Sequence, residues 1–328
     1  MQARSFPQAF VDSAKRRVRA ALIPATRAYM RYAPTDLGKR ALWSRFVAPR
    51  LAWASHEFES KTLFGGHLRG NTADLIQRYI YYFGTWEPHI TQWMSASLRP
   101  GDGFIDVGAN IGYYSVLAAS LVGPDGPIVA IDASPGIFLA LEANLRLNKA
   151  RARTIQAAVS DRRCRLPVFR APPDNAGSTT TIRDGIIGAE SFVLEGEVDA
   201  SPLGDLLTDE EVRRARIIKI DVEGAELSVA RGMAELFPRL RPDCEIILEI
   251  GPHRLIAQGA TVESLLSIFT EAGYFAYNIP NDYSCKDYLP PVKAEPPTRL
   301  RAPVTDQCDL IFSRRDVETL PTRAAPRT

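Results

Sequence analysis

The sequence contains few cysteines and no paired ones. Its four cysteines, Cys164, Cys244, Cys285 and Cys308, are scattered, and no C-x-x-C motif occurs. Structural zinc sites and disulfide frameworks both need closely or regularly spaced cysteines, so this pattern argues against either. We therefore expect buried free thiols and a cytoplasmic protein.

Long apolar runs are also missing. No stretch of about 18 apolar residues is present, which argues against a transmembrane helix. The N-terminus carries Arg4 and a basic group within residues 15–19, but no apolar segment of the signal-peptide type follows it. The basic group favours a solvated helix face over contact with acidic lipid. The net charge is only +2, which gives no reason to expect a nucleic-acid partner.

The residues that are present are typical of one large globular domain with an appendage. The chain has 328 residues, of which 45% are hydrophobic and 24% are charged, so it can bury a sizeable core. Prolines interrupt residues 1–70, which we expect to form a helical N-terminal extension. We place the main domain at residues 71–315 and predict a disordered tail at residues 316–328.

Apolar strands and amphipathic helices alternate through the main domain. We expect two helices around residues 83–88, and further helices at 111–121, 135–148, 225–236 and 261–272. Strands are expected at 104–107, 128–131, 154–159, 216–220, 245–250, 274–279 and 309–312, with two more at 165–169 and 191–198. This alternation predicts an α/β fold with a parallel sheet and right-handed crossovers.

The segment GFIDVGANIGYY, residues 103–114, runs from a strand into a helix through a turn. Gly108 and Gly112 let the backbone pass close to a ligand, and the amides of the following helix point to the same place, where they can hold a carboxylate. A dinucleotide fingerprint would need glycine where Gly108, Asn110 and Tyr113 stand. Two of these three positions fail, so the turn disfavours a pyrophosphate cofactor and favours a nucleoside without phosphates.

The next two strands end in acidic residues. Asp132 ends the second strand, about 20 residues beyond the turn, where a carboxylate can accept hydrogen bonds from both ribose hydroxyls. The third strand ends at Ser160 and Asp161, beside the expected place of an adenine. Asp161 either accepts a hydrogen bond from the adenine amino group or caps a turn.

Taken together, several segments resemble the FkbM-type S-adenosylmethionine-dependent methyltransferases. They are GFIDVGANIGYYS, IVAIDASPGIFLALEANLRLN, AAVSD, NAGSTTT, IIKIDVEGAELSVARGM and EIILEI. The resemblance spans about residues 80–280, and its most specific part is the combination of KIDVEGAE with DVGANIG. It implies a class I methyltransferase Rossmann-like fold with a seven-stranded, mostly parallel sheet, strand order 3-2-1-4-5-7-6 and an antiparallel last strand. It also implies O-methylation of small molecules or sugars.

The same resemblance suggests how S-adenosylmethionine binds. Asp106 would lie below the methionine amino group, and residues 108–112 would wrap its carboxylate. Glu87 is either a second acid for the amino group or a helix-cap acid. Asp132 and Ala133 stand where the family commonly shows Glu-Pro, and the aspartate keeps the ribose-binding chemistry. The predicted cofactor-binding residues are Glu87, Asp106, Gly108, Ala109, Asn110, Gly112, Asp132, Ala133, Ser160, Asp161 and Asp221.

Four residues beyond the fourth and fifth strands are candidates for the chemistry: Asp221, Glu223, Glu249 and His253. Asp221 either orients the cofactor or accepts the proton of the acceptor, and Glu249 would line the acceptor side. His253 is either a general base, since its pKa lies near neutral, or a surface loop histidine. Asp221 and Glu223 are oxygen ligands of the kind that Mg²⁺ prefers, but two acids are few, so we predict no metal.

The leading hypothesis is an S-adenosylmethionine-dependent O-methyltransferase that acts on a small-molecule or glycan hydroxyl. An N-methyltransferase is the alternative within the same chemistry. A nucleoside-binding module without transferase activity is the alternative outside enzymes. Asn110 and Tyr113 count against an NAD-dependent oxidoreductase.

Overall fold

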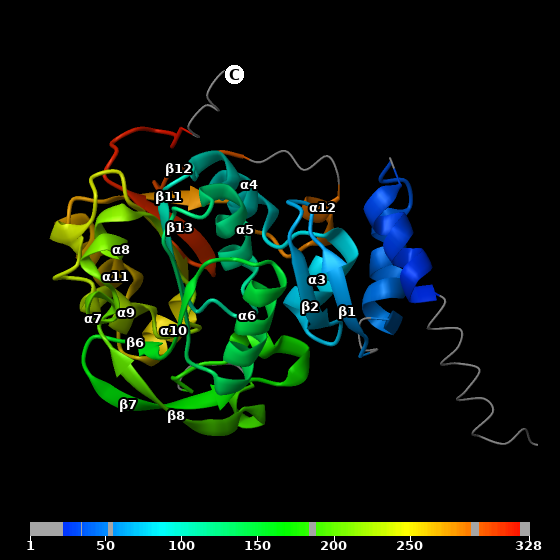
Figure 1. Ribbon diagram of the computed structural model, residues 1–328, viewed down its shortest axis with the longest axis horizontal. Coiled ribbons are helices and arrows are strands. Elements are labelled where there is room, and N and C mark those ends of the chain that lie inside the picture. Colours follow the sequence, from blue (N-terminus) through cyan, green and yellow to red (C-terminus); the bar gives the residue numbers. More distant parts are fainter. Residues whose placement is uncertain (1–21, 34, 52–54, 184–187, 290–294, 322–328) are drawn as a thin grey trace, which may run out of the picture.

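The computed structural model describes residues 22–33, 35–51, 55–183, 188–289 and 295–321. Its centre is an eight-stranded sheet (Figure 1). Across the sheet, the strands are β12 (Thr298–Arg299), β11 (Phe275–Ile279), β13 (Cys308–Ser313), β10 (Glu245–Ile250), β9 (Ala215–Ile220), β3 (Gly103–Val107), β4 (Ile128–Asp132) and β5 (Arg153–Gln156).

The topology of this sheet confirms the predicted fold class. Strands β5, β4, β3, β9 and β10 pair in parallel, whereas β13 is antiparallel to both β10 and β11. Counted along the chain from β3, and leaving β12 aside, the order is the expected 3-2-1-4-5-7-6. The edge strand β12 is not predicted by the sequence pattern, because two residues are too few to produce a period.

Helices cover both faces of the sheet. One face carries α3 (Leu75–Phe83), α4 (Pro88–Ser97), α5 (Tyr113–Val122) and α6 (Pro135–Leu147). The other carries α7 (Leu203–Leu206), α8 (Asp209–Arg214), α9 (Glu226–Gly232), α10 (Pro252–Ala257) and α11 (Val262–Glu271). Successive strand residues alternate between the two cores, so that Phe104 packs on the first and Ile105 on the second. This coverage explains why every residue of β3, β4, β9 and β10 is buried.

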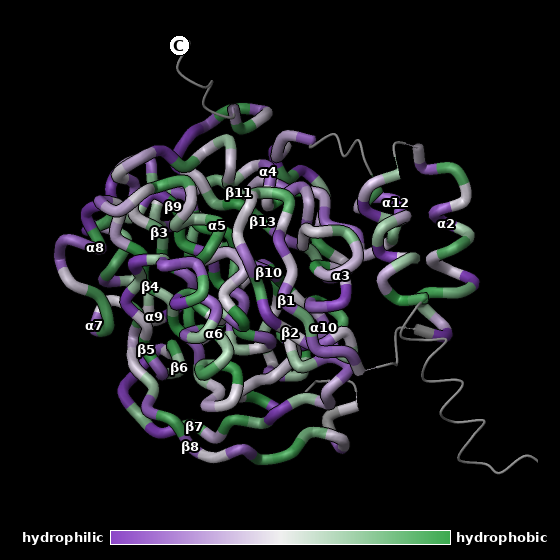
Figure 2. The backbone as a smooth tube through the Cα atoms, turned by 45° about the vertical axis from the view of Figure 1, so that its right-hand side comes forward, coloured by the Kyte–Doolittle hydropathy of each residue, from purple (hydrophilic) through white to green (hydrophobic). Residues whose placement is uncertain are grey.

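The prediction of the third strand, at residues 154–159, is wrong at its C-terminal end. The strand breaks after β5, and β6 (Ala158–Val159) joins a separate three-stranded sheet with β8 (Val193–Ser201) and β7 (Cys164–Arg170). The chain changes sheets at Ala157, whose N–H donates to the carbonyl of Asp132. In Figure 2 the tube through β7 and β8 alternates between hydrophilic and hydrophobic residues, as expected of a sheet with one solvated face.

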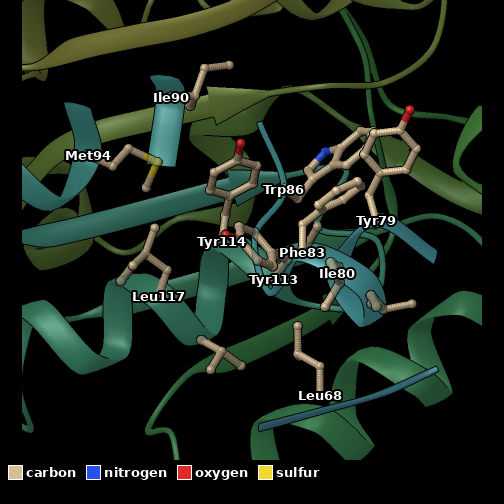
Figure 3. Packing of buried hydrophobic residues seen from close by; sticks show 14 of the residues in the cluster. Leu68, Tyr79, Ile80, Phe83, Trp86, Ile90, Met94, Tyr113, Tyr114 and Leu117 are labelled. Carbon is tan, nitrogen blue, oxygen red and sulfur yellow. The ribbon is translucent and has the colours of Figure 1, made fainter. Parts of the chain in front are cut away.

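Aromatic side chains join α3, α4 and the first turn of α5 (Figure 3). The rings of Tyr113 and Tyr114 lie 5.2 Å apart in a T-shaped arrangement, and the Tyr113 hydroxyl contacts the hydroxyls of Thr85 and Thr91 at 3.1 and 3.2 Å. Tyr113, which stands where a dinucleotide fingerprint has glycine, is therefore a core residue. These contacts fix α4 and the segment that precedes it against the first turn of α5.

The N-terminal segment is not wholly helical. Residues 22–32, α2 (Lys39–Leu42) and the π-helix Trp43–Leu51 are helical, but β1 (Glu57–Lys61) and β2 (His67–Asn71) form a hairpin. In β1 exposed and buried residues alternate, but the buried ones are Phe58 and the polar Ser60, so its sequence EFESK gives no apolar period. The hairpin packs on the main domain, since the N–H groups of His67 and Arg69 donate to the side chains of Asn148 and Asn144. Residues 1–21 lie outside the described part of the chain.

The C-terminal tail is ordered further than predicted. Leu320 is 1% exposed, and its N–H donates to the carbonyl of Pro297. Residues 316–321 therefore pack on the domain, which contradicts the predicted disorder there, and residues 322–328 lie outside the described part. Cys244 is buried as predicted, whereas Cys164, Cys285 and Cys308 are half-buried. Across the residues described, none of the helices has both the length and the apolar character to cross a membrane.

Candidate active site

A cavity opens at the carboxyl ends of β3, β4 and β9, where the strand order reverses. This is the usual ligand position in an open parallel sheet. Six of the predicted site residues line it: Gly108, Asn110, Asp132, Ala133, Asp221 and Glu223. Apolar side chains, among them Ile76, Ile137, Val159 and Val168, form much of the rest of its wall.

The turn after β3 approaches the end of β9 very closely. Gly108 has φ +77, and a Cβ atom there would lie 1.8 Å from the carbonyl oxygen of Asp221. Asn110 also has a positive φ, +50, which asparagine tolerates better than most residues. A glycine at position 108 is therefore required by the backbone of this chain and does not by itself indicate a ligand.

The amides of the turn are already used within the protein. Those of Gly108 and Ala109 donate to the carbonyl of Ile131, that of Asn110 to Asp132 Oδ2, and that of Gly112 to the carbonyl of Ala109. The expectation that residues 108–112 hold a carboxylate through their amides is not supported by this geometry. The turn shapes the cavity, while Ala109 and Gly112 lie behind its lining.

Replacing Gly108 by alanine should destabilise the fold by about 2–5 kcal/mol, because the new Cβ meets backbone and cannot be relieved by a side-chain rotation. Differential scanning calorimetry should show a melting temperature lower by roughly 5–15 °C. Gly273 has φ +81, and a Cβ atom there would meet no neighbour within 4 Å, so Gly273→Ala tests the backbone cost alone, about 1 kcal/mol. Equal losses in the two variants would contradict the close approach.

Asp132 is buried at the end of β4 and is held by two backbone groups. Its Oδ2 accepts from the N–H of Asn110 and its Oδ1 from the N–H of Ser134, both at 2.9 Å. Burial raises the pKa of Asp132 to about 7, against the lowering effect of these two hydrogen bonds. Each oxygen keeps a further lone pair, so the carboxylate can still accept from a ligand.

Asp106 lies underneath the turn and not in the cavity. It is 1% exposed, and its Oδ2 accepts from the Ser115 hydroxyl at 2.6 Å. Burial raises its pKa to about 6. Asp106 thus anchors the start of α5 from inside the core.

Glu87 is the centre of a buried polar network that, like Asp106, contacts the first turn of α5. The Tyr114 hydroxyl donates to its Oε2 at 2.5 Å and the Asn281 amide to its Oε1 at 3.0 Å. Its φ is +39, and it precedes α4 without capping it through its side chain. Glu87 therefore stands at the N-cap position of α4, but its carboxylate does not act as the cap. Burial raises the pKa of Glu87, and the nearby Lys219 ammonium opposes this shift.

The end of β9 carries a lysine and two acids. Lys219 Nζ lies 2.7 Å from Asp221 Oδ2 and 4.8 Å from the centre of the Tyr114 ring. Asp221 keeps a 24% exposed side chain. Because residues 219 and 221 share one face of the strand, they extend the polar network from Glu87 to the cavity.

Arg254 of α10 pairs with the acids at the C-terminal ends of β9 and β10. Its Nη2 is 2.5 Å from Glu223 Oε2, and its Nη1 is 3.3 Å from Glu249 Oε1. Burial raises the pKa of Glu223 to about 8 and places that of Glu249 well above its ordinary value. The oxygens of Asp221, Glu223 and Glu249 lie within 4.8 Å of one another, which is close enough for a metal ion.

A loop at residues 172–182, which we term the covering loop, closes one side of the cavity. It contains the short helix Pro173–Ser178, and Gly177, Thr179, Thr180 and Thr181 line the cavity. Asp74, at the start of α3, accepts from the N–H of Ala176, and the Thr180 hydroxyl donates to the carbonyl of Glu223. The loop thus joins α3 to the end of β9.

Comparison with known proteins identifies the family. The model of the FkbM methyltransferase domain matches residues 106–276, just over half of the chain. The chain belongs to the FkbM methyltransferase family. It is an S-adenosylmethionine-dependent methyltransferase, as the sequence predicted, and S-adenosylmethionine is its cofactor.

Individual relatives of this FkbM-family chain are distant. The 31-O-demethyl-FK506 methyltransferase FkbM of Streptomyces tacrolimicus is 28% identical over 208 residues, which cover 56% of this chain and 76% of that protein. Methyltransferase sdnD of Sordaria araneosa is 28% identical over 166 residues, covering 43% and 63%. Among solved structures, Aeropyrum pernix fibrillarin with natively bound S-adenosyl-L-methionine is 11% identical, with TM-score 0.37 and coverage of 81% and 85%.

The cavity of this FkbM-family protein fits the cofactor in the chemistry of its lining. Asp132 presents a buried carboxylate suited to hydroxyl groups. Ile137, Ala158 and Val159 provide apolar surface for a flat base, and Asp221 and Glu223 place carboxyl groups at the other side. No pyrophosphate-binding set of free amides competes with this assignment, since the amides of the turn after β3 have internal partners.

Some predicted site residues lie outside this cavity. The third strand ends early, so Ala157, Ala158 and Val159 line the cavity instead of Ser160 and Asp161. His253 is exposed on α10, and its ring does not reach the site. The prediction of a general base at His253 is therefore not supported by the geometry.

Lys219 and Arg254, which pair with the acids, are not among the predicted site residues. Lys219 could have been found by the two-residue periodicity of β9, because it precedes Asp221 by two positions inside an apolar strand. Arg254 gave no such signal, since its role depends on where α10 begins.

Proposed function

We propose that this protein methylates a hydroxyl group of a small molecule or glycan, with Asp221 as the residue that accepts the hydroxyl proton. S-adenosylmethionine supplies, when bound, a methyl group activated by its sulfonium. The observation that carries the proposal is the position of Asp221, which lines the cavity at the strand-order switch and remains partly exposed.

Asp221 is suited to this task by its surroundings. Lys219 bonds to Oδ2 at 2.7 Å and so fixes the orientation of the carboxylate. A positioned carboxylate within hydrogen-bond reach of the acceptor can take its proton as the methyl group is transferred. Glu249 would line the acceptor side. It follows Ile247 by two residues, so both side chains lie on the same face of β10, and Ile247 packs in the same core as Ile217, on the face of β9 that Asp221 continues.

The remaining residues of the cavity would hold the cofactor. We assign Asp132 to the ribose hydroxyls and the apolar wall at Ala158 and Val159 to the adenine. Glu87 is buried outside the lining of the cavity, so we assign it an indirect role at the methionine ammonium, through its network with Asn281 and Lys219, which ends at Asp221. The cytoplasmic location expected from the four free cysteines stays a prediction.

A hydroxyl is favoured over an amine as the acceptor. The relative from Streptomyces tacrolimicus bears a name that specifies an oxygen acceptor, on 31-O-demethyl-FK506. A neutral amine can attack the methyl group before it loses a proton, whereas a hydroxyl needs a base, which gives the carboxylate of Asp221 a role.

A transfer assay tests this function. The protein should convert S-adenosylmethionine to S-adenosylhomocysteine with one or more hydroxyl acceptors of a panel that contains 31-O-demethyl-FK506, monosaccharides and matched amino sugars. Mass spectrometry should locate the methyl group on oxygen. Methylation confined to the amino sugars would favour the N-methyltransferase. Binding of S-adenosylhomocysteine without product across the panel would favour a binding module.

A further inference from the structure

The acids at the C-terminal ends of β9 and β10 have the spacing of a metal site, but they already bind a cationic side chain of the protein, that of Arg254. Oxygens of Asp221, Glu223 and Glu249 lie within 4.8 Å of one another. The guanidinium of Arg254 lies 2.5 Å from Glu223 and 3.3 Å from Glu249, and 3.8 Å from the buried Glu226. Its planar fork can bond several carboxylates at once.

We propose that Arg254 is a positioning residue that takes the place of a divalent metal among these carboxylates and holds Glu223 and Glu249 beside Asp221. Only the role of Asp221 as the base beside the methyl acceptor rests on the proposed function. The occupation of the acid cluster by Arg254 is independent of it.

The path of the Arg254 side chain is determined by the chain around it. α10 begins two residues after β10, so its first turn lies directly over the strand ends. The side chain of Arg254 is 10% exposed and runs past Gly251, where a Cβ atom would lie 3.1 Å from Arg254 Cδ. The guanidinium is thereby directed back toward the acids and away from solvent.

The turn that carries Glu223 needs such support. Glu223 has φ +53, a conformation that costs about 1–3 kcal/mol for a residue with a Cβ atom, and Gly224 follows with φ +112. Arg254 pairs with the Glu223 side chain, Gln258 donates to the carbonyl of Gly224, and Thr180 donates to the carbonyl of Glu223. Two elements, α10 and the covering loop, therefore fix the position of the turn.

Removal of the Arg254 charge should open the cluster to a metal. In isothermal titration calorimetry with Mn²⁺, we expect Arg254→Ala to bind one ion at least about tenfold more tightly than the wild type. The added site should disappear in the double variant Arg254→Ala/Glu249→Gln, and electron paramagnetic resonance of bound Mn²⁺ should follow the same order. Arg254→Lys, which keeps a positive charge, should exclude Mn²⁺ as the wild type does.

A matched variant separates this effect from lost stability. Arg216 forms a buried 2.7 Å pair with Glu245 at the opposite ends of the same two strands. Arg216→Ala should lower the melting temperature without adding Mn²⁺ binding that depends on Glu249. If Arg254→Ala does not fold, Arg254→Met, which removes the charge but keeps a long side chain, takes its place with the same expected gain in Mn²⁺ binding.

Two results would overturn the proposal. One is a wild-type protein that binds one Mn²⁺ ion and loses it in Glu249→Gln. The other is equal Mn²⁺ binding by the wild type and Arg254→Ala. Titration with S-adenosylhomocysteine tests the proposed function separately, because failure of wild-type cofactor binding would leave the Mn²⁺ comparison unchanged.

Discussion

Replacing Asp132 by asparagine should weaken the binding of S-adenosylhomocysteine by roughly 10- to 100-fold, as expected for hydrogen bonds to a charged acceptor. Both oxygens of Asp132 accept from backbone N–H groups, of Asn110 and Ser134. An asparagine of the same size must turn its NH₂ group toward one of these donors. The variant therefore loses the charge and also disturbs the turn that shapes the cavity. Isothermal titration calorimetry measures the affinity.

The pH dependence of this binding identifies the group. Burial raises the pKa of Asp132 to about 7, and its ionised form is the better acceptor for ribose hydroxyls. Wild-type affinity should therefore rise between about pH 6 and pH 8, while Asp132→Asn should lack this rise. The free energy of unfolding depends on pH in the opposite direction from the affinity. The folded-state pKa lies above the unfolded value, so the contribution of Asp132 is full below the unfolded pKa and is lost as pH rises through about 7.

The control for Asp132 is Asp125, an exposed acid in the turn before β4. Asp125→Asn should leave both the affinity and its pH dependence unchanged. An unchanged affinity in Asp132→Asn would contradict the assignment of Asp132 to the ribose and would leave the family assignment unaffected.

The central sheet is predictable because its strands are buried on both faces. The apolar residues Ile246, Ile247, Leu248 and Ile250 place β10 at residues 245–250, and β3, β4 and β9 follow the prediction within a residue or so at each end. The third strand is not predictable in this way, because the choice of Ala158 and Val159 between two sheets depends on β8, some 40 positions along the chain. The hairpin β1–β2 escapes prediction because the prolines before it suggest broken helices.

In the site, acids at strand ends are predictable and their partners are not. Asp132 and Asp221 end parallel strands that meet at one edge of the sheet, which brings them to the same cavity. Judged by side-chain pKa alone, His253 is a better candidate for a general base than Arg254. Successive residues of a helix differ by about 100° in direction, so once α10 begins at Pro252 only one of these two neighbours can face the acids. The partners of Arg254 depend on that helix start.

Replacing Asp221 by asparagine should reduce turnover about 100- to 10,000-fold while changing the affinity for S-adenosylhomocysteine by no more than about threefold. Asparagine preserves the shape of the side chain and can still accept a hydrogen bond from Lys219, so the geometry of the strand end is retained. It cannot take a proton from a hydroxyl at neutral pH. Turnover is measured with a hydroxyl acceptor from the panel and affinity by calorimetry.

The surface variant Asp199→Asn, at a side chain that is 82% exposed, should leave both quantities unchanged. Equal loss of turnover and affinity in Asp221→Asn would make Asp221 a ligand of the cofactor only. Unchanged turnover would transfer the role to a neighbour, and Glu249 is then the candidate, because its oxygen lies within 4.8 Å of that of Asp221. Both carboxylates have a cationic partner, Lys219 at 2.7 Å for Asp221 and Arg254 at 3.3 Å for Glu249, but Asp221 lines the cavity, and this position favours Asp221 as the base.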